Sequence, residues 1–144
     1  MTFLEQWFEE VWNKGRIEAI DEMSCPDVIT HGLEHADGTR VNGRAAFKVF
    51  HKQLRASFSN IHIDVMHTLS QGDITMAHCV VTGVHSGDGL GMPATGRRVS
   101  FTGMCLVRLE GGKAAEAWNN FDLASVYRQL AVTRRDQSSL KSHA

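Results

Sequence analysis

Large apolar residues near the start of the chain recur at the spacing of an amphipathic helix. Thr2 and Glu5 have the spacing of a capping box, which satisfies main-chain amides at the start of a helix. The apolar positions that follow share one face: Phe3, Leu4, Trp7, Phe8, Val11 and Trp12. Because glycine commonly ends a helix, Gly15 marks its C-terminus. The pattern therefore predicts a first helix with a broad apolar face.

Two further helices are predicted before residue 60. Residues 17–23 form a short helix that ends before Cys25-Pro26, and residues 27–31 are β-branched and extended. Residues 32–43 are polar and contain glycine, which indicates a loop. A long helix then runs from Arg44 to Phe58. Its apolar face consists of Phe47, Phe50, Leu54 and Phe58.

After Asn60 the hydrophobic period changes to two, which is typical of strands. Four strands are predicted, at residues 61–69, 74–85, 98–109 and 113–122. They are separated by a turn at 71–73, a glycine-rich loop at 86–96 and a tight turn at 110–112. A last helix is predicted at 123–130, with Asp122 as its cap, accepting from the amide of Ala124 or Ser125.

Helices segregated from a run of antiparallel strands indicate an α+β fold. We expect a cone-shaped, curved antiparallel sheet, covered on its concave face by the three N-terminal helices and followed by a short C-terminal helix. One domain spans residues 1–131, and residues 132–144 form a polar tail. The side chains expected to be buried between sheet and helices are Phe8, Trp12, Phe47, Phe50, Val81, Phe101 and Phe121.

Strand alternation also assigns an outer face to the sheet. The residues expected there are Met76, His78, Val80, Met104, Leu106, Glu116 and Trp118. A monomer that exposed this set would present a large apolar patch, so we expect a homodimer through the outer face. On the last strand, Ala115, Ala117, Asn119 and Phe121 share the opposite, inner face.

Composition narrows the classes of function. The 144 residues carry 15 Lys and Arg against 16 Asp and Glu, a net charge of −1, which does not favour nucleic-acid binding. No apolar stretch approaches the ~20 residues that span a bilayer, and no signal peptide is visible. Three cysteines, an odd number in apolar contexts, predict reduced thiols and a cytoplasmic protein.

Few residues form a recognisable chemical motif. The eight histidines lack the spacing of a metal site, and no nucleophile elbow occurs. The glycine-rich loop leads into a strand rather than a helix, so it is interpreted as a hairpin at a pocket mouth and not as a phosphate cradle. Cys105 fits a small apolar filler of the inner face. Asn119, a polar residue between Ala117 and Phe121, either faces an apolar cavity or bonds a neighbouring loop.

Several segments together resemble the SnoaL-like polyketide cyclase family of the nuclear-transport-factor-2-like superfamily. They are Val11-Trp12-Asn13-Lys14-Gly15, Pro26-Asp27 to His31-Gly32, Gly83-Val84-His85-Ser86-Gly87, Pro93-Ala94-Thr95-Gly96-Arg97-Arg98-Val99, Phe101-Thr102-Gly103 and Trp118-Asn119-Asn120-Phe121-Asp122. The resemblance covers about residues 3 to 131. It implies the cone-shaped fold, a dimer packed through the sheet, and ring closure by intramolecular aldol condensation without a cofactor.

The resemblance also implies site residues. The family's catalytic aspartate falls at Asn119 and its neighbouring histidine at Ala117, and neither Asn nor Ala can accept the proton. His31 matches a polar, pocket-lining position of the family. Strand alternation, which His85 shares with Cys79 and Val81, places His85 at the cavity mouth, so the expected catalytic set is His31, Asn119 and His85. The expected ligand-binding set is Trp12, Phe47, Phe50, Val81, Phe101, Cys105, Ala117 and Phe121.

Three functions remain open on this basis. The first is a cofactor-independent lyase, isomerase or cyclase that acts on a hydrophobic, polyketide-like carbonyl compound, with His31 as the principal acid–base group. The second is a relative of family members that assist hydroxylation of polyketides. The third is a non-catalytic protein that binds a small apolar ligand. Fold alone does not choose among them.

Overall fold

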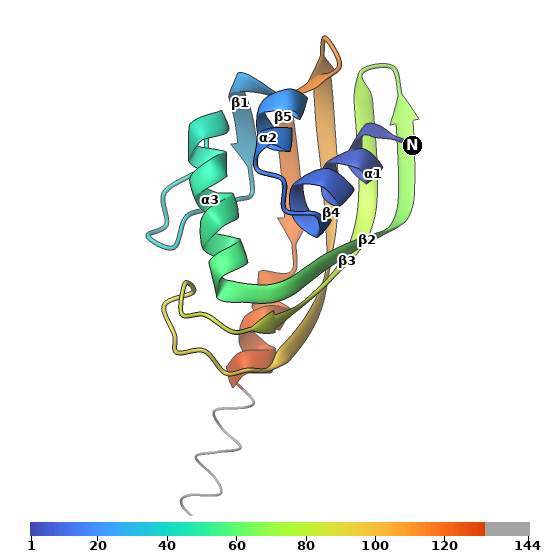
Figure 1. Cartoon of the computed structure of the whole chain (residues 1–144). Coiled ribbons are helices and arrows are strands. Elements are labelled where there is room, and N and C mark those ends of the chain that lie inside the picture. Colours follow the sequence, from blue (N-terminus) through green and yellow to red (C-terminus); the bar gives the residue numbers. More distant parts are fainter. Residues whose placement is uncertain (132–144) are drawn as a thin grey trace, which may run out of the picture.

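One curved sheet of five strands runs through the computed structural model, which describes residues 1–131 (Figure 1). The strands are β1 (Ser24–His31), β2 (Phe58–Gln71), β3 (Ile74–His85), β4 (Arg98–Glu110) and β5 (Lys113–Phe121). Their spatial order is β1-β5-β4-β3-β2, and the pairs from β2 to β5 are antiparallel, as predicted. The polar tail predicted at 132–144 lies outside the described residues.

The fifth strand was not part of the predicted sheet. The sequence indicates an extended segment at 27–31, and in the structure β1 is longer and pairs in parallel with β5. In this register Thr30 lies beside Ala117, and His31 lies beside Trp118. Because paired residues point to the same side of a sheet, Thr30 shares the inner face with Ala117. His31 shares the outer face with Trp118.

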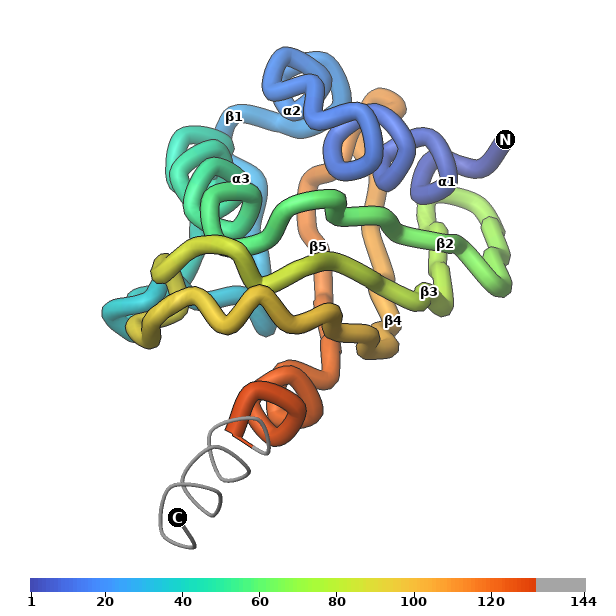
Figure 2. Tube along the Cα trace, turned by 60° about the horizontal axis from the view of Figure 1, so that its bottom comes forward, coloured from blue at the N-terminus to red at the C-terminus, as the bar shows by residue number. Residues whose placement is uncertain are grey.

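Helices cover the concave face of the sheet (Figures 1 and 2). They are α1 (Phe3–Trp7), the π-helix η1 (Phe8–Asn13), α2 (Glu18–Met23) and α3 (Arg44–Ser57). Residues 123–131 form a further helix at one end of the sheet. No helix of the described residues is long and apolar enough to cross a membrane.

The first predicted helix is present but changes its winding. Thr2 and Glu5 form the predicted capping box, and Gly15, with φ +70°, follows the helix end. From Phe8 onward the helix is wound as a π-helix, in which the amide of Lys14 donates to the carbonyl of Glu9 at 2.9 Å. The wider turn keeps Phe8 and Trp12 buried against the sheet.

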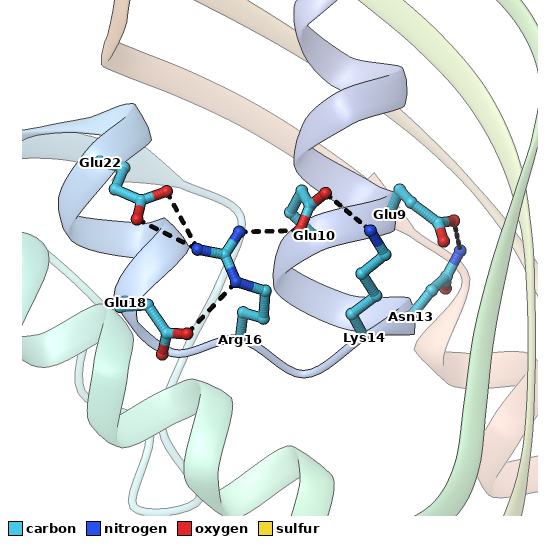
Figure 3. A network of polar contacts seen from close by, with 7 residues as sticks. All are labelled: Glu9, Glu10, Asn13, Lys14, Arg16, Glu18 and Glu22. Carbon is cyan, nitrogen blue, oxygen red and sulfur yellow. Dashed lines mark hydrogen bonds and ion pairs between the residues drawn. The ribbon is translucent and has the colours of Figure 1, made fainter.

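Two polar residues fix this N-terminal layer in place. Asn13 exchanges two hydrogen bonds with the main chain of Ile63 on β2, at 3.0 and 2.7 Å. Arg16 binds Glu10 of η1 and also two carboxylates of α2, so it ties the two helices together (Figure 3). The Arg16 hydrogen bond holds the pKa of Glu10 below its usual value.

The buried core follows the predicted pattern with one local shift. Phe8, Trp12, Phe47 and Val81 are buried, whereas Phe50, Phe101 and Phe121 are half-buried against them. A bulge in β5 pairs Arg108 with Glu116 but Leu109 with Ala114. The bulge corrects the predicted alternation, because Ala114 rather than Ala115 lines the cavity between sheet and helices.

The last helix begins as predicted. The amide of Ser125 donates to Oδ1 of Asp122 at 3.0 Å, which satisfies one free amide of the first turn. Val126 and Leu130 of this helix are buried against Phe58 and Val99. This second cluster closes the sheet end that the N-terminal helices leave uncovered.

Candidate functional site

A cavity of about 440 Å³ lies between the concave face of the sheet and the helices. This volume is within the ~300–1,000 Å³ of sites for small molecules. Its wall is mostly apolar and aromatic. All eight residues expected to bind ligand line it: Trp12, Phe47, Phe50, Val81, Phe101, Cys105, Ala117 and Phe121.

Asn119 of β5 places an amide in this apolar wall. Its Oδ1 accepts a hydrogen bond from the Cys105 thiol at 3.3 Å, and its Nδ2 donates to the main-chain oxygen of His31 at 3.1 Å. The carbonyl of His31 accepts only, so this contact fixes which end of the amide is nitrogen. An amide nitrogen carries two hydrogens, and the second has no partner within residues 1–131. Asn119 therefore presents one N–H to a ligand.

Gly32 makes the close approach between β1 and β5 possible. It has φ +84°, and a Cβ at this position would lie 1.9 Å from the main-chain oxygen of Asn119. Only glycine combines this conformation with this spacing. The chain turns away from the sheet here, and the following loop continues the cavity wall.

The two cysteines of the inner face are neutral thiols. Burial raises the pKa of Cys105 to about 12, with a smaller contribution from neighbouring Cys79. Burial raises the pKa of Cys79 to about 11. Because the thiolate is the nucleophile, neither residue is suited to covalent catalysis. The Cys105 thiol instead serves as a weak donor to Asn119.

The structure corrects the expected position of His31. The residue lies on the outer face, because the parallel pairing with β5 places it beside Trp118, and it does not line the cavity. Its ring stacks on Trp118 with centroids 5.2 Å apart. Arg40 donates to Nδ1 at 3.2 Å, so Nε2 carries the proton that is donated to Glu116 at 2.8 Å. This hydrogen bond lowers the pKa of Glu116.

His85 is also away from the cavity wall. It follows the inner-face alternation of β3, but it is fully buried beside Phe58 and is not among the lining residues. Its Nδ1 accepts from the Thr95 amide at 3.2 Å and lies 3.0 Å from the Thr95 hydroxyl. Within residues 1–131, Nε2 of His85 is the one buried side-chain nitrogen or oxygen atom that has no hydrogen-bond partner. His85 thus anchors the end of the 86–96 loop.

Sequence reasoning missed several polar residues of the cavity wall. They are Glu34, His35, Gln53, Ser57 and Tyr127. Those on loops or helix edges follow no strand alternation, so periodicity gave no signal for them. His31 and His35 have the spacing H-x-x-x-H, but in a glycine-containing loop this spacing did not indicate a site. Among the described residues, no three His, Cys, Asp or Glu side chains are grouped to hold a metal ion.

Three comparisons with known proteins agree. The nogalonic acid methyl ester cyclase of Streptomyces nogalater is 32% identical over 121 residues, which cover 83% of this chain and 88% of that protein. The aklanonic acid methyl ester cyclase of Streptomyces sp. strain C5 is 31% identical over 123 residues, covering 84% and 75%. The crystal structure of a candidate polyketide cyclase from Acidithiobacillus ferrooxidans superposes with a TM-score of 0.77 at 28% identity, covering 91% and 93%.

A family model also matches almost all of the described sequence. The model of the SnoaL-like polyketide cyclases matches residues 2–130, which is nearly the whole described chain. The five-stranded curved sheet and its covering helices are also those of the solved relative. The chain therefore belongs to the SnoaL-like polyketide cyclase family.

Proposed function

We propose that the cavity binds a hydrophobic, polyketide-like carbonyl compound and that the protein acts on it by acid–base chemistry without a cofactor. The apolar wall suits a fused aromatic body, and the few polar groups suit its oxygen substituents. Two relatives are, by name, cyclases of aklanonic acid methyl ester and nogalonic acid methyl ester. The resemblance places the family's catalytic aspartate at Asn119, which cannot act as a base. In this protein another group must therefore accept the proton.

Asn119 is the observation that carries this proposal. Its free N–H lies in an apolar wall, where a hydrogen bond is worth more than in water. A carbonyl oxygen is the natural acceptor, and an enolate oxygen is a stronger one because it carries charge. In this protein the residue stabilises negative charge on the substrate oxygen, where an aspartate would remove a proton.

The proposed reaction is an intramolecular aldol ring closure. A base takes the proton α to the carbonyl, and the electrons of that C–H bond form an enolate whose oxygen is bonded by Asn119. The enolate carbon attacks a second carbonyl of the same molecule and forms the new C–C bond. The resulting alkoxide takes back a proton, so no oxidant, reductant or metal is consumed.

Neighbouring asparagines on opposite faces of β5 provide the test. Nogalonic acid methyl ester is added to the protein, its binding is followed by quenching of Trp7 and Trp12 in the cavity wall, and its products are separated by chromatography and mass spectrometry. Asn119→Ala should weaken binding and turnover by at least about 10-fold, the loss of one hydrogen bond to a charged oxygen. The control Asn120→Ala, exposed on the outer face, should change neither.

Other results of these binding and product measurements would favour a different function. Absence of quenching at saturating ester contradicts the proposed ligand class. Binding without any product favours a non-catalytic binding protein. An oxygenated product, formed only when a reductant and O₂ are supplied, favours the hydroxylase-like alternative.

We also propose that the protein is a cytoplasmic homodimer that packs through the outer face of the sheet. Met104 is 50% exposed and Trp118 is 37% exposed on this face. Half-buried Met76, Val80 and Leu106 join them into one apolar area that crosses β3, β4 and β5. A second copy would cover this area and the adjoining pair of His31 and Glu116. The three cysteines are unpaired, which suits a reducing compartment.

A further inference from the structure

His35 is the histidine of the described chain that reaches the cavity. Residues 1–131 contain seven histidines, and only His35 is among the cavity-lining residues. His31 and His85 are engaged elsewhere, as described above. His51 is buried under the π-helix, where its Nε2 donates to the carbonyl of Val11 at 2.7 Å.

A small hairpin fixes the position of His35. Glu34 pairs with Arg40 across it, and the His35 amide donates to the carbonyl of Thr39 at 2.8 Å. The Gly38 amide donates back to the carbonyl of His35 at 2.9 Å, which closes a tight turn. Both main-chain groups of His35 are thus bonded within the hairpin. The residue is held by its backbone and not by its ring.

The imidazole itself is free to act on a ligand. Within the described residues neither of its ring nitrogens has a hydrogen-bond partner, whereas both nitrogens of His31 are bonded. Histidine is the side chain that accepts and returns a proton most readily near neutral pH. The other side chain of the wall that can accept a proton in this way is the carboxylate of Glu34, and it is exposed to solvent.

The hairpin also starts beside Asn119. Gly32 lies directly against the main-chain oxygen of Asn119, and His35 follows three residues later on the same cavity wall. A ligand whose carbonyl oxygen is bonded by Asn119 therefore occupies the cavity whose wall includes this hairpin. This arrangement brings a proton acceptor and an oxygen-binding amide to one cavity from two neighbouring elements.

We infer that His35 is the proton-transfer residue of this cavity, an inference that rests on the proposed function. Its neutral imidazole takes the proton from the carbon α to the carbonyl that Asn119 binds. The electron pair of the C–H bond moves into the enolate, and the imidazolium later returns the proton to the alkoxide formed by ring closure. His35 and Asn119 together thus do what the resemblance assigns to an aspartate and a histidine of the last strand.

The test follows the α-proton directly. Nogalonic acid methyl ester is incubated with the protein in D₂O, and loss of the α-proton signal is measured by NMR together with the rate of ring closure. His35→Gln should lower the rate of exchange and kcat by about 100-fold or more, the usual contribution of a general base. The dissociation constant of the ester should change less than about 3-fold, because the apolar wall is intact.

Two controls separate chemistry from folding. His31→Gln removes the other histidine of the H-x-x-x-H segment and should leave exchange and kcat within about 3-fold of the original rates. His35→Ala should be restored in part by free imidazole in the buffer, which a misfolded variant cannot show. Unchanged exchange in His35→Gln, loss of exchange in His31→Gln, or absence of rescue each overturns the assignment.

The proposed function fails separately from this inference. If the unaltered protein does not bind the ester, the ligand class is wrong. If it binds the ester and exchanges the α-proton but His35→Gln does so equally well, only the role of His35 is wrong. If it binds the ester and never exchanges the proton, the role of His35 is overturned while the binding site stands.

Discussion

The side-chain amide of Asn119 donates a hydrogen bond of 3.1 Å to the main-chain oxygen of His31. The bond crosses the parallel pair β1 and β5, so the side chain of Asn119 also ties two strands together. An aspartate could not make it while ionised, because carboxylate and carbonyl oxygens both accept. The amide therefore suits this backbone, because its nitrogen can donate to the carbonyl of β1.

Asn119→Asp should make the stability of the protein depend on pH. The new carboxyl would lie in a poorly solvated wall opposite the His31 oxygen, which should raise its folded-state pKa above the unfolded value of ~3.9. The variant is then closest in stability to the original protein at acid pH. Its stability decreases as pH rises from ~4 to the folded-state pKa of the new carboxyl. We expect a loss of about 1–3 kcal/mol at pH 8, measured by urea unfolding. An equal loss at pH 4.5 and pH 8 would contradict this.

Gly32→Ala should be far more damaging than Gly38→Ala. Both glycines have a positive φ, of +84° and +86°, so alanine is strained by about 1–2 kcal/mol at either position. At Gly38 the added Cβ meets nothing, whereas at Gly32 it would lie 1.9 Å from the oxygen of Asn119. We expect Gly32→Ala to lose at least about 2 kcal/mol more in urea unfolding. Similar losses in the two variants would show that β1 and β5 separate without cost.

The sequence predicted most of the fold because its elements are strongly periodic. The capping box at Thr2, the cap at Asp122 and the inner face containing Asn119 are all present as expected. Each of these depends only on residues close together in the chain. The predicted alternation in β5 is wrong at Ala114 and Ala115, where the strand has a bulge. The two residues are identical, so the sequence does not indicate which of them faces inward.

The site was harder to predict because it depends on contacts between distant residues. The side of the sheet on which His31 lies is decided by its register with Trp118, 87 residues further on. His85 follows the inner alternation, yet Phe58 and Thr95 enclose it. The position of His35 depends on a hairpin within a polar loop. None of these three placements follows from local spacing.

Alkylation should distinguish the three cysteines. Burial holds the pKa of Cys79 at about 11 and that of Cys105 at about 12, so at pH 8 only about one Cys79 thiol in a thousand is ionised. Cys25 is only half-buried. Iodoacetamide at pH 8 should therefore label Cys25 first, as read by peptide mass spectrometry. Labelling of Cys105 at the same rate in the folded protein would mean that the inner face opens readily.

His51 should make the protein sensitive to acid. Burial lowers the pKa of His51 below its ordinary value of 6.5, against the raising effect of its bond to Val11, and Arg55 lowers it further. As pH falls below 6.5, His51 is protonated more readily in the unfolded chain than in the folded protein. The free energy of unfolding therefore decreases as the solution becomes more acidic. The slope from one such group is at most about 1.4 kcal/mol per pH unit. Urea unfolding between pH 7 and pH 5 measures it.

A matched pair of variants isolates this contribution. His51→Gln keeps a donor for Val11 but cannot titrate, so the fall in stability with acid should become shallower. The control Asn120→Ala removes an exposed side chain that does not titrate, and the slope should stay as it was. Identical slopes for the original protein and both variants would assign the acid sensitivity to other groups.

The proposed dimer is tested by two equally exposed apolar residues on different surfaces. Met104 on the outer face of β4 and Val49 on α3 are each 50% exposed. A charge buried in an apolar interface costs several kcal/mol, so Met104→Glu should convert a dimer of the 16.0 kDa chain into a monomer. Val49→Glu should leave the dimer intact. Sedimentation velocity at micromolar concentration gives the masses, and a monomeric mass for the unaltered protein would disprove the interface. Equal dissociation by both variants would locate the contact elsewhere, because only Met104 lies on the sheet.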